Sequence, residues 1–373
     1  MSFTPDELLR YQRHLSLSGF GPEAQAKLQR GSILVIGAGG LGCPALLYLT
    51  AAGVGRITII DADTVDVSNL QRQVLYTTAD TGQPKATAAA ARLLALNPLL
   101  NITPVVARFT RDNALALVAA HDVVLDGSDN FSTRYLVNDA CVLADRPLVY
   151  GAIQGFEGQA SVFNHHGGPT YRCLFPEPPA PGTVLNCAEA GVLGVLPGLI
   201  GTIQATEAIK VLTGLGEPLS GRLLLWNSLT MTSRTLRFAA DPASRAITEL
   251  PPDGYGETCS GPSSSPAANP DELTAGDLHA RLASVQLIDV REDWERALGA
   301  IQPSVHVPLG TLDTDSARAA LASLDPQRPT VVYCAGGVRS LKALPALRAR
   351  HGFTSVISLR GGYKAWSAKP SVQ

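Results

Sequence analysis

Two short glycine-rich loops carry the residues of this chain that could do chemistry. Cys334 opens the stretch CAGGVRS directly after the apolar run of residues 330–333, and Arg339 adds a positive charge. Backbone N–H groups in such a loop surround a thiolate, lower its pKa and hold an anionic sulfur species. Far upstream, the stretch GAGGLG also follows an apolar run. Together the two loops predict nucleotide-driven chemistry coupled to sulfur transfer.

The upstream loop has the spacing of a phosphate-binding turn. Gly37, Gly39 and Gly42 give GxGxxG between a predicted strand and a predicted helix, where glycine permits a tight turn and the helix N-terminus favours phosphate. Asp61 and Asp63 end the next strand about twenty residues later, where a carboxylate binds a ribose hydroxyl. This pattern alone fits an NAD-dependent dehydrogenase equally well.

Charged residues farther along the chain favour phosphoryl chemistry over hydride transfer. Arg72 lies in SNLQRQ, Lys85 opens a predicted helix, and Asp126 and Asp129 end a predicted strand in the run DGSDN. Nucleotidyl transfer needs cations that neutralise phosphates and a carboxylate that holds magnesium. A dehydrogenase needs neither of the two cations.

The elements that position these residues alternate between strand and helix. Strands are expected at residues 32–36, 56–60, 103–107, 123–125 and within 146–153, and helices at 41–52 and 83–96. This alternation predicts a parallel sheet with helices on both faces. The later stretches GQASVFN, RLLLWNS and RTLRF are expected to pair as antiparallel strands. The fold class is therefore α/β, with a doubly wound, Rossmann-like sheet.

A second, smaller α/β domain is expected after a linker. Residues 251–271 are rich in Pro, Ser and Gly, which is typical of a linker. A shorter alternation follows, with strands around 285–290, 330–334 and 355–359 and helices around 275–282 and 340–350. We therefore expect a domain over 1–250, a linker over 251–271 and a second domain over 272–373.

Bulk properties exclude several classes of partner. The net charge of −2 over 373 residues gives no electrostatic case for nucleic acid or an anionic membrane. The first residues predict a helix capped by Thr4 and Glu7 rather than a signal peptide, so a cytoplasmic protein is expected. The six cysteines form no CxxC pair, and Cys43 and Cys141 are expected to be buried apolar residues.

The first 250 residues resemble a known family. The stretch GAGGLGCPALLYLTAAGVGRITIIDADTVDVSNLQRQ, together with RYQRHL, GQPKA, DGSDN and NCAEAGVLGVLPGLIG, is similar to the ubiquitin-activating-type adenylyltransferases of the MoeB and ThiF group. With its second domain, the chain resembles the fused adenylyltransferase and sulfurtransferase form of that group. The resemblance implies that ATP activates the C-terminal glycine of a ubiquitin-like sulfur-carrier protein with a Gly-Gly tail.

The resemblance also implies roles for single residues. Asp61 would bind the ribose of ATP, Lys85 the triphosphate and Asp129 a magnesium ion, while Arg13 would reach into the ATP site of a partner subunit in a homodimer. The residues implied in nucleotide binding are Gly37, Gly39, Gly40, Gly42, Asp61, Asp63, Ser68, Asn69, Arg72, Lys85, Asp129 and Asn130.

The second domain resembles rhodanese through IDVRE, VHVPL, CAGGVRS and LRGGYKAW. Cys334 would then carry a persulfide, supplied by a cysteine desulfurase or by thiosulfate. Ala300 stands where a histidine is common, which leaves the donor open. Cys187, in NCAEAG, matches the family's mobile-loop cysteine and would attack the adenylated carrier or the acyl persulfide.

One departure from the family concerns zinc. The family's zinc site uses two CxxC pairs, but here only Cys173 remains of the first pair, with Thr170 in the other position, and residues 238–250 contain no cysteine. A single thiolate cannot hold a tetrahedral zinc ion. We expect no zinc, with packing or hydrogen bonds in its place.

Two alternatives remain open at this stage. An NAD-dependent oxidoreductase with an appended domain would use the glycine turn for a dinucleotide, and a catalytically silent scaffold would only bind a carrier protein. The cations Arg72 and Lys85 argue against the first alternative, and the joint presence of Lys85, Asp129 and Cys334 argues against the second.

Overall fold

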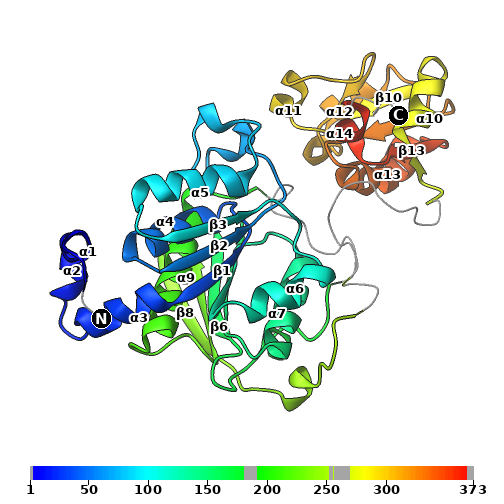
Figure 1. The fold of residues 1–373 in the computed structure, drawn as a ribbon. Coiled ribbons are helices and arrows are strands. Elements are labelled where there is room, and N and C mark those ends of the chain that lie inside the picture. The colour runs from blue at the N-terminus through cyan, green and yellow to red at the C-terminus, as the bar shows by residue number, and fades with distance from the viewer. Residues whose placement is uncertain (1–2, 180–190, 252–254, 256–268, 368–373) are drawn as a thin grey trace. The chain divides into compact units, whose positions relative to one another are not determined.

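The computed structural model describes residues 3–179, 191–251, 255 and 269–367. The chain forms two compact units, Met1–Cys259 and Ser260–Gln373. Figure 1 shows each unit with its own sheet and its own helices.

The first unit is built on one large sheet. Its strands are β1 (Ser32–Ile36), β2 (Arg56–Ile60), β3 (Asn101–Val105), β4 (Val123–Asp126), β5 (Leu148–Gln154), β6 (Glu157–Phe163), β7 (Arg222–Asn227) and β8 (Thr232–Arg237). Its helices are α1 (Pro5–Arg10), α2 (Gln12–Leu15), α3 (Gly21–Arg30), α4 (Gly42–Ala52), α5 (Lys85–Leu96), α6 (Arg111–Ala119), α7 (Phe131–Leu143) and α9 (Val195–Thr213), with short 3₁₀ turns η1 (Val67–Asn69), η2 (Thr78–Asp80), η3 (Tyr171–Cys173) and η4 (Pro242–Arg245).

The strand order confirms the predicted mixed sheet. The order is β3-β2-β1-β4-β5-β6-β7-β8. Pairing is parallel from β3 to β5 and antiparallel from β5 to β8. The strand predicted at 103–107 instead begins at Asn101, because Arg56 of β2 pairs with Asn101 and the two strands start level.

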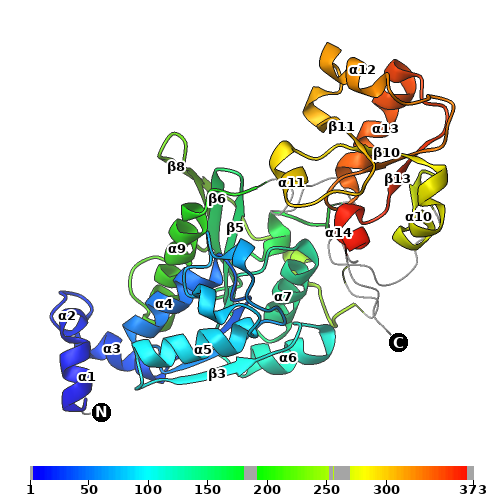
Figure 2. The same ribbon diagram turned by 90° about the horizontal axis from the view of Figure 1, so that it is seen from above.

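Helices cover both faces of this sheet, as predicted. Alternate residues of β1 point to opposite sides: Ile33 and Val35 pack in a core with α3, α4, α5 and α9, while Leu34 and Ile36 pack in a core with α6 and α7. Figure 2 shows α4 and α9 on one side of the sheet and α7 on the other. Cys43 and Cys141 are fully buried in these two cores, which confirms their predicted apolar role.

Helix α9 is long and apolar enough to cross a membrane by length and composition alone. It nevertheless packs against α4 and the strands β4, β5 and β6. Its buried Glu207 pairs with Lys210 at 2.5 Å and accepts a hydrogen bond from the backbone of Leu219. The helix is therefore part of the packed core of the first unit.

The chain begins with the predicted capped helix. The Thr4 side chain accepts a hydrogen bond from the backbone N–H of Glu7 at 3.2 Å, and the Glu7 carboxylate accepts one from the backbone N–H of Thr4 at 2.7 Å. This reciprocal arrangement satisfies two backbone donors that a helix start otherwise leaves unpaired.

The second unit has a smaller sheet with wholly parallel pairing, in the order β11-β10-β12-β13-β9. Its elements are β9 (Glu272–Leu273), α10 (Ala275–Arg281), η5 (Leu282–Ser284), β10 (Gln286–Asp289), α11 (Asp293–Ala297), β11 (Val305–His306), η6 (Leu309–Thr311), α12 (Asp315–Leu321), β12 (Thr330–Tyr333), α13 (Val338–His351), β13 (Val356–Leu359) and α14 (Gly362–Ser367). The small α/β fold that the sequence predicts is confirmed.

Candidate functional site

The glycine turn follows β1 and ends at the start of α4. Gly37 has φ of +88°, which a residue with a side chain rarely adopts, and a Cβ there would meet the carbonyl oxygen of Gly127 at 2.9 Å. A Cβ at Gly42 would meet the carbonyl oxygen of Gly37 at 2.0 Å. The turn is therefore closed tightly against the loop that follows β4.

The same turn presents free backbone donors. The N–H groups of Gly39, Gly40 and Leu41 make no hydrogen bond to any residue that the structure describes. They precede α4, whose N-terminus carries a partial positive charge. Adjacent free donors at a helix start bind phosphate oxygens well.

Asp61, at the end of β2, closes the other side of the turn. Its carboxylate accepts hydrogen bonds from the backbone N–H groups of Ala38 and Asp63, both at 2.8 Å. Burial raises the pKa of Asp61, although these hydrogen bonds oppose the shift. The carboxylate is thus held at the edge of the turn, where the sequence places the ribose.

Lys85 forms an ion pair with Asp63. The Lys85 Nζ lies 3.0 Å from Asp63 Oδ2, and its side chain is 7% exposed while that of Asp63 is 73% exposed. Asp63 therefore holds Lys85 in place at the turn. Tyr76, which no sequence pattern singled out, joins the two parts, since its hydroxyl contacts the carbonyl oxygens of Ala38 at 2.8 Å and Lys85 at 3.3 Å.

Arg72 lies over the glycine turn. Its Cδ is 3.7 Å from the position of a Cβ on Gly40, and its guanidinium donates to the carbonyl of Ser68 at 3.3 Å. Ser68 and Asn69 both lie in the 3₁₀ turn η1, where Asp66 accepts hydrogen bonds from the backbone and hydroxyl of Ser68. The SNLQRQ segment is thus folded back onto the turn.

The carboxyl end of β4 supplies the acidic residues. Asp126 is 1% exposed, and its Oδ2 has no hydrogen-bond partner among the described residues. Burial raises its pKa, which the positive charge of Arg134 opposes. Asp129 is exposed, and its side chain makes no hydrogen bond or ion pair with a described residue. A free carboxylate of this kind suits a magnesium ion.

Asn130 has a structural partner. Its side chain accepts a hydrogen bond from the backbone N–H of Thr133 at 2.9 Å and so caps α7. The cap orients the loop that carries Asp129.

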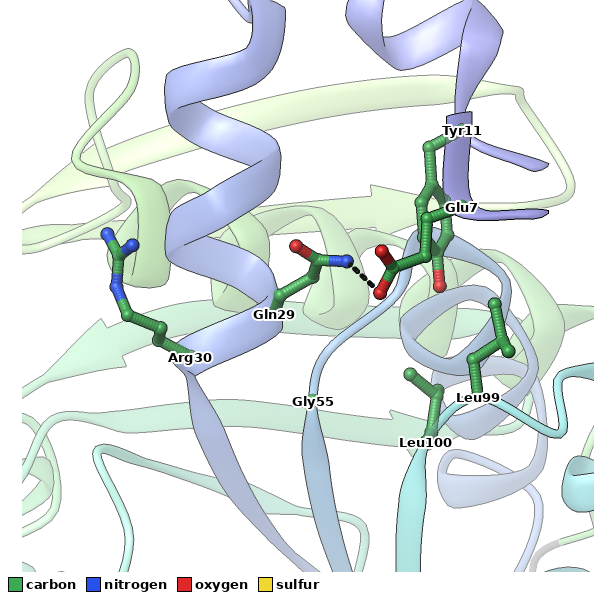
Figure 3. A pocket seen from close by; sticks show the side chains of 7 residues that line it. All are labelled: Glu7, Tyr11, Gln29, Arg30, Gly55, Leu99 and Leu100. Carbon is green, nitrogen blue, oxygen red and sulfur yellow. Dashed lines mark hydrogen bonds between the residues drawn. The ribbon is translucent and has the colours of Figure 1, made fainter. Parts of the chain in front are cut away.

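One predicted residue lies apart from this group, and another is not described. Arg13 is exposed on α2, and Cys187 lies outside the described residues. A pocket at the opposite edge of the sheet, beside the starts of β2 and β3, is lined by none of the predicted site residues; there Gln29 donates to Glu7 at 2.8 Å (Figure 3).

The Cys334 loop joins β12 to α13. The sulfur accepts hydrogen bonds from the backbone N–H of Gly337 at 3.1 Å and from the hydroxyl of Ser340 at 3.5 Å. The N–H groups of Ala335 and Gly336 donate to no described residue. The loop therefore has further donors for a second, anionic sulfur atom on Cys334.

Arg339 does not supply a free positive charge to this loop. Its guanidinium binds both carboxylate oxygens of Glu295, at 2.7 and 2.5 Å, and Glu295 is 8% exposed. Burial acts to raise the pKa of Glu295, but the hydrogen bonds from Arg339 and from the backbone of Glu292, together with the charges of Arg339 and Arg291, lower it overall. The sequence could not reveal this pairing, since α11 and α13 meet only in the fold.

Cys173 is the centre of a hydrogen-bonded cluster. Its sulfur lies 3.3 Å from the backbone nitrogens of Thr170 and Asp241 and 3.1 Å from the hydroxyl of Ser244, and the hydroxyls of Thr170 and Ser244 are 2.9 Å apart. The cluster joins η3 to η4 with hydrogen bonds, as the sequence suggested. With one thiolate and two hydroxyls, these side chains do not fit a zinc ion.

Comparisons with known proteins agree with this geometry. Residues 11–246 match the ThiF family, and residues 274–369 match the rhodanese-like domain. The chain is 44% identical to the probable adenylyltransferase/sulfurtransferase MoeZ of Mycobacterium tuberculosis, over 97% of this chain and 93% of that protein. It is 40% identical to the mouse adenylyltransferase and sulfurtransferase MOCS3, over 98% of this chain and 86% of that protein.

Two further relatives match only the first unit. The sulfur carrier protein adenylyltransferase of Thermus thermophilus is 55% identical over 65% of this chain and 91% of its own. The crystal structure of E. coli MccB with ATP superposes with a TM-score of 0.56 and 20% identity, over 64% of this chain and 74% of that one, which shows a shared fold.

The family match confirms the predicted resemblance and fold class and removes the support for the dinucleotide-dependent alternative. The glycine turn with its flanking cations and the buried thiol in its own loop are the two sites expected of such a chain. The chain therefore belongs to the ThiF family, with a rhodanese-like domain after it.

Proposed function

We propose that the chain is an adenylyltransferase and sulfurtransferase that acts on a ubiquitin-like sulfur-carrier protein with a Gly-Gly tail. Adenylation is assigned to residues 1–250 and sulfur transfer to residues 272–373. The observation that carries the first step is the set of free N–H groups at Gly39, Gly40 and Leu41, flanked by Arg72 and Lys85. The names of the full-length relatives support both activities.

The adenylation step follows from the charges at this edge of the sheet. A carboxylate oxygen of the carrier's terminal glycine attacks the α-phosphorus of ATP, the bond to the bridging oxygen breaks, and pyrophosphate leaves. Lys85 and Arg72 stabilise the negative charge on the phosphates, and the N–H groups of the glycine turn fix the position of the phosphates. Asp129 is proposed to hold magnesium, which neutralises phosphate charge when it is bound.

The sulfur step uses Cys334. The terminal sulfur of its persulfide attacks the acyl carbon, the bond to AMP breaks, and AMP leaves. A Cys187 thiolate then attacks the sulfur of Cys334, which releases the carrier thiocarboxylate and forms a Cys187–Cys334 disulfide. A dithiol reductant returns both thiols. In the alternative order, Cys187 first takes the acyl group as a thioester. The persulfide comes from a cysteine desulfurase or from thiosulfate.

A homodimer with shared sites is part of the proposal. Leu9 and Tyr48 are 77% and 56% exposed. Tyr48 lines a hollow together with His14, Ala51, Thr202, Thr206 and Ile209. Arg13 lies exposed on the same short N-terminal segment. An apolar surface next to an unpaired arginine suits a second copy of the chain, whose ATP site the arginine would complete. The protein is proposed to act in the cytoplasm, without nucleic acid or a membrane.

The test of adenylation is ATP–pyrophosphate isotope exchange with magnesium and a panel of Gly-Gly-tailed carriers. We expect exchange with one carrier and its loss in Asp129→Ala. Absence of exchange with every carrier would instead favour the scaffold alternative.

The test of shared sites is complementation between Arg13→Ala and Asp129→Ala. Each variant alone should be inactive, whereas a one-to-one mixture that exchanges subunits should recover about a quarter of the wild-type exchange rate, because half the dimers then contain one intact site. No recovery in a mixture that is shown to exchange subunits would contradict the role of Arg13.

A further inference from the structure

A buried cluster on α7 connects two chain segments that are far apart in the sequence, residues 172–177 and Tyr255. Asp139 is 1% exposed and binds Arg172 through two hydrogen bonds, from Nε at 2.8 Å and from Nη2 at 2.7 Å. Tyr255, from the Pro/Ser/Gly-rich linker, donates its hydroxyl to the same carboxylate at 2.6 Å. The linker is therefore bound to the first unit at this point.

The contact between Tyr255 and the first unit goes beyond one hydrogen bond. The Tyr255 ring stacks on Tyr135 with centroids 6.3 Å apart and planes 23° apart, and the Arg172 guanidinium lies 5.9 Å from the Tyr255 centroid. Upstream, Leu250 is 3% exposed, and its carbonyl accepts from Arg111 at 3.2 Å. Aromatic, cationic and polar contacts thus converge on a residue of the linker.

The same cluster binds three consecutive carbonyl groups of the segment that leads to Cys187. The Tyr135 hydroxyl contacts the carbonyl oxygens of Phe175 at 3.0 Å and Glu177 at 2.7 Å. Arg172 donates from Nη1 to the carbonyl of Pro176 at 2.9 Å. The two side chains that hold this segment are the two against which Tyr255 packs.

We propose that Tyr255 is a positioning residue that latches the linker to the first unit. Through Arg172 and Tyr135 it also holds residues 175–177, which precede Cys187 in the sequence. The proposal rests on the proposed sulfur step for the roles of Cys187 and Cys334. In the sequence, residues 175–177 precede Cys187, and the linker that contains Tyr255 precedes the unit that carries Cys334. The latch therefore fixes one point of the linker on the first unit, next to the segment that leads to Cys187. Fixing this point of the linker shortens its free part, which raises the effective concentration of the Cys334 persulfide at the carrier bound to the first unit.

The structural test is hydrogen–deuterium exchange of residues 171–177 in the full chain. In Tyr255→Ala, the amides of Leu174 and Phe175, which bond to the carbonyl of Tyr171, should exchange about tenfold faster, as expected for the loss of a charge-assisted hydrogen bond. Tyr255→Phe retains the ring and should give an intermediate increase. Glu249→Ala, an exposed neighbour outside the cluster, is the matched control and should match the wild type.

The functional test separates positioning from stability. Tyr255→Ala should slow thiocarboxylate formation from a preloaded Cys334 persulfide about threefold, while ATP–pyrophosphate exchange stays unchanged. Unchanged deuterium uptake at 171–177 would overturn the latch, and an equal fall in both activities would reduce Tyr255 to a structural residue. Should the wild type form no thiocarboxylate, the proposed function fails, and the deuterium measurement still decides whether the latch exists.

Discussion

The two units contain the same local structure, a parallel strand that is followed by a glycine turn and then a helix. They differ in the group to which the N–H donors of the turn are directed. Gly37 follows β1 with φ of +88°, and Gly337 precedes α13 with φ of +99°. In the first turn the free N–H groups face no anionic side chain of the loop itself, so a phosphate from outside fits there. In the second, the backbone N–H of Gly337 donates to a group of the chain itself, the sulfur of Cys334.

This difference also explains the surrounding charges. The first turn has Arg72 packed over it and Lys85 near it, and the proposed triphosphate would need such cations. The second has its arginine neutralised by Glu295. The sulfur of Cys334 instead accepts hydrogen bonds from the backbone N–H of Gly337 and the hydroxyl of Ser340.

The largest expected effect comes from removing the thiol of Cys334. Cys334→Ala should reduce thiocarboxylate formation by at least about a thousandfold, because the nucleophile that carries sulfur is gone. ATP–pyrophosphate exchange should stay within about twofold of the wild type, measured on the same preparation. Loss of both activities would contradict the separation of the two sites.

Changing the turns themselves should break one activity at a time. Gly37→Ala forces a Cβ to 2.9 Å from the carbonyl of Gly127, and Gly337→Ala forces one to 3.0 Å from the backbone nitrogen of Gly361. Displacement of a turn by about 1 Å costs on the order of a hundredfold in rate. We expect Gly37→Ala to lose pyrophosphate exchange only and Gly337→Ala to lose sulfur transfer only; a crossed result would refute the comparison.

The two units should also differ in their response to mild acid. His121 is 3% exposed in the first unit, bonded to Thr58 and Leu117, and burial lowers its pKa. Its neutral form is favoured in the folded state, so its contribution to stability is present above the unfolded pKa of about 6.5 and is lost as the pH falls below it.

In the second unit the buried titratable group that we compare with His121 is the carboxyl group of Asp289. Burial acts to raise the pKa of Asp289, but the hydrogen bonds and positive charge of Arg291, together with a hydrogen bond from Tyr333, lower the pKa overall. Its contribution persists down to the unfolded pKa of about 3.9 and is lost only as the pH falls further, through its lower folded pKa. Between pH 7.5 and 5.5, calorimetry should show a falling melting temperature for the first unit only, and His121→Gln should weaken that dependence. Equal shifts in both units would be inconsistent with this assignment.

The smallest effect is expected at the Cys173 cluster. Cys173→Ala leaves the donors of Thr170, Asp241 and Ser244 without their acceptor and should cost about 1 kcal/mol of unfolding free energy. Cys173→Ser should retain most of it. Chemical denaturation measures both, and added zinc should leave the wild-type midpoint unchanged; a zinc-dependent midpoint would show that the hydrogen bonds are not the substitute for a metal.

The sequence predicted the elements whose pattern is local. The strand–glycine–helix segments around Gly37 and Cys334 and the cap at Thr4 depend on neighbouring residues, and the structure confirms them. Helix α9 was not predicted as an element, because an apolar helix packed on several sides lacks the one-sided periodicity of a surface helix.

Contacts between distant segments could not be predicted. The pairing of Arg339 with Glu295 and the contact of Tyr255 with Asp139 join residues 44 and 116 positions apart. No spacing rule relates such pairs, since they depend on how whole elements pack. The roles of the site residues stay predictions until they are tested by substitution.

The close packing of the first turn also limits which residues can replace its glycines. Any residue other than glycine at position 42 would place its Cβ 2.0 Å from the carbonyl of Gly37, with backbone on both sides of the clash. A library that randomises positions 37–42 and is selected for folding should therefore return glycine at position 42 in every clone. Attempts to change nucleotide preference by evolution would have to begin at the flanking side chains rather than in the turn.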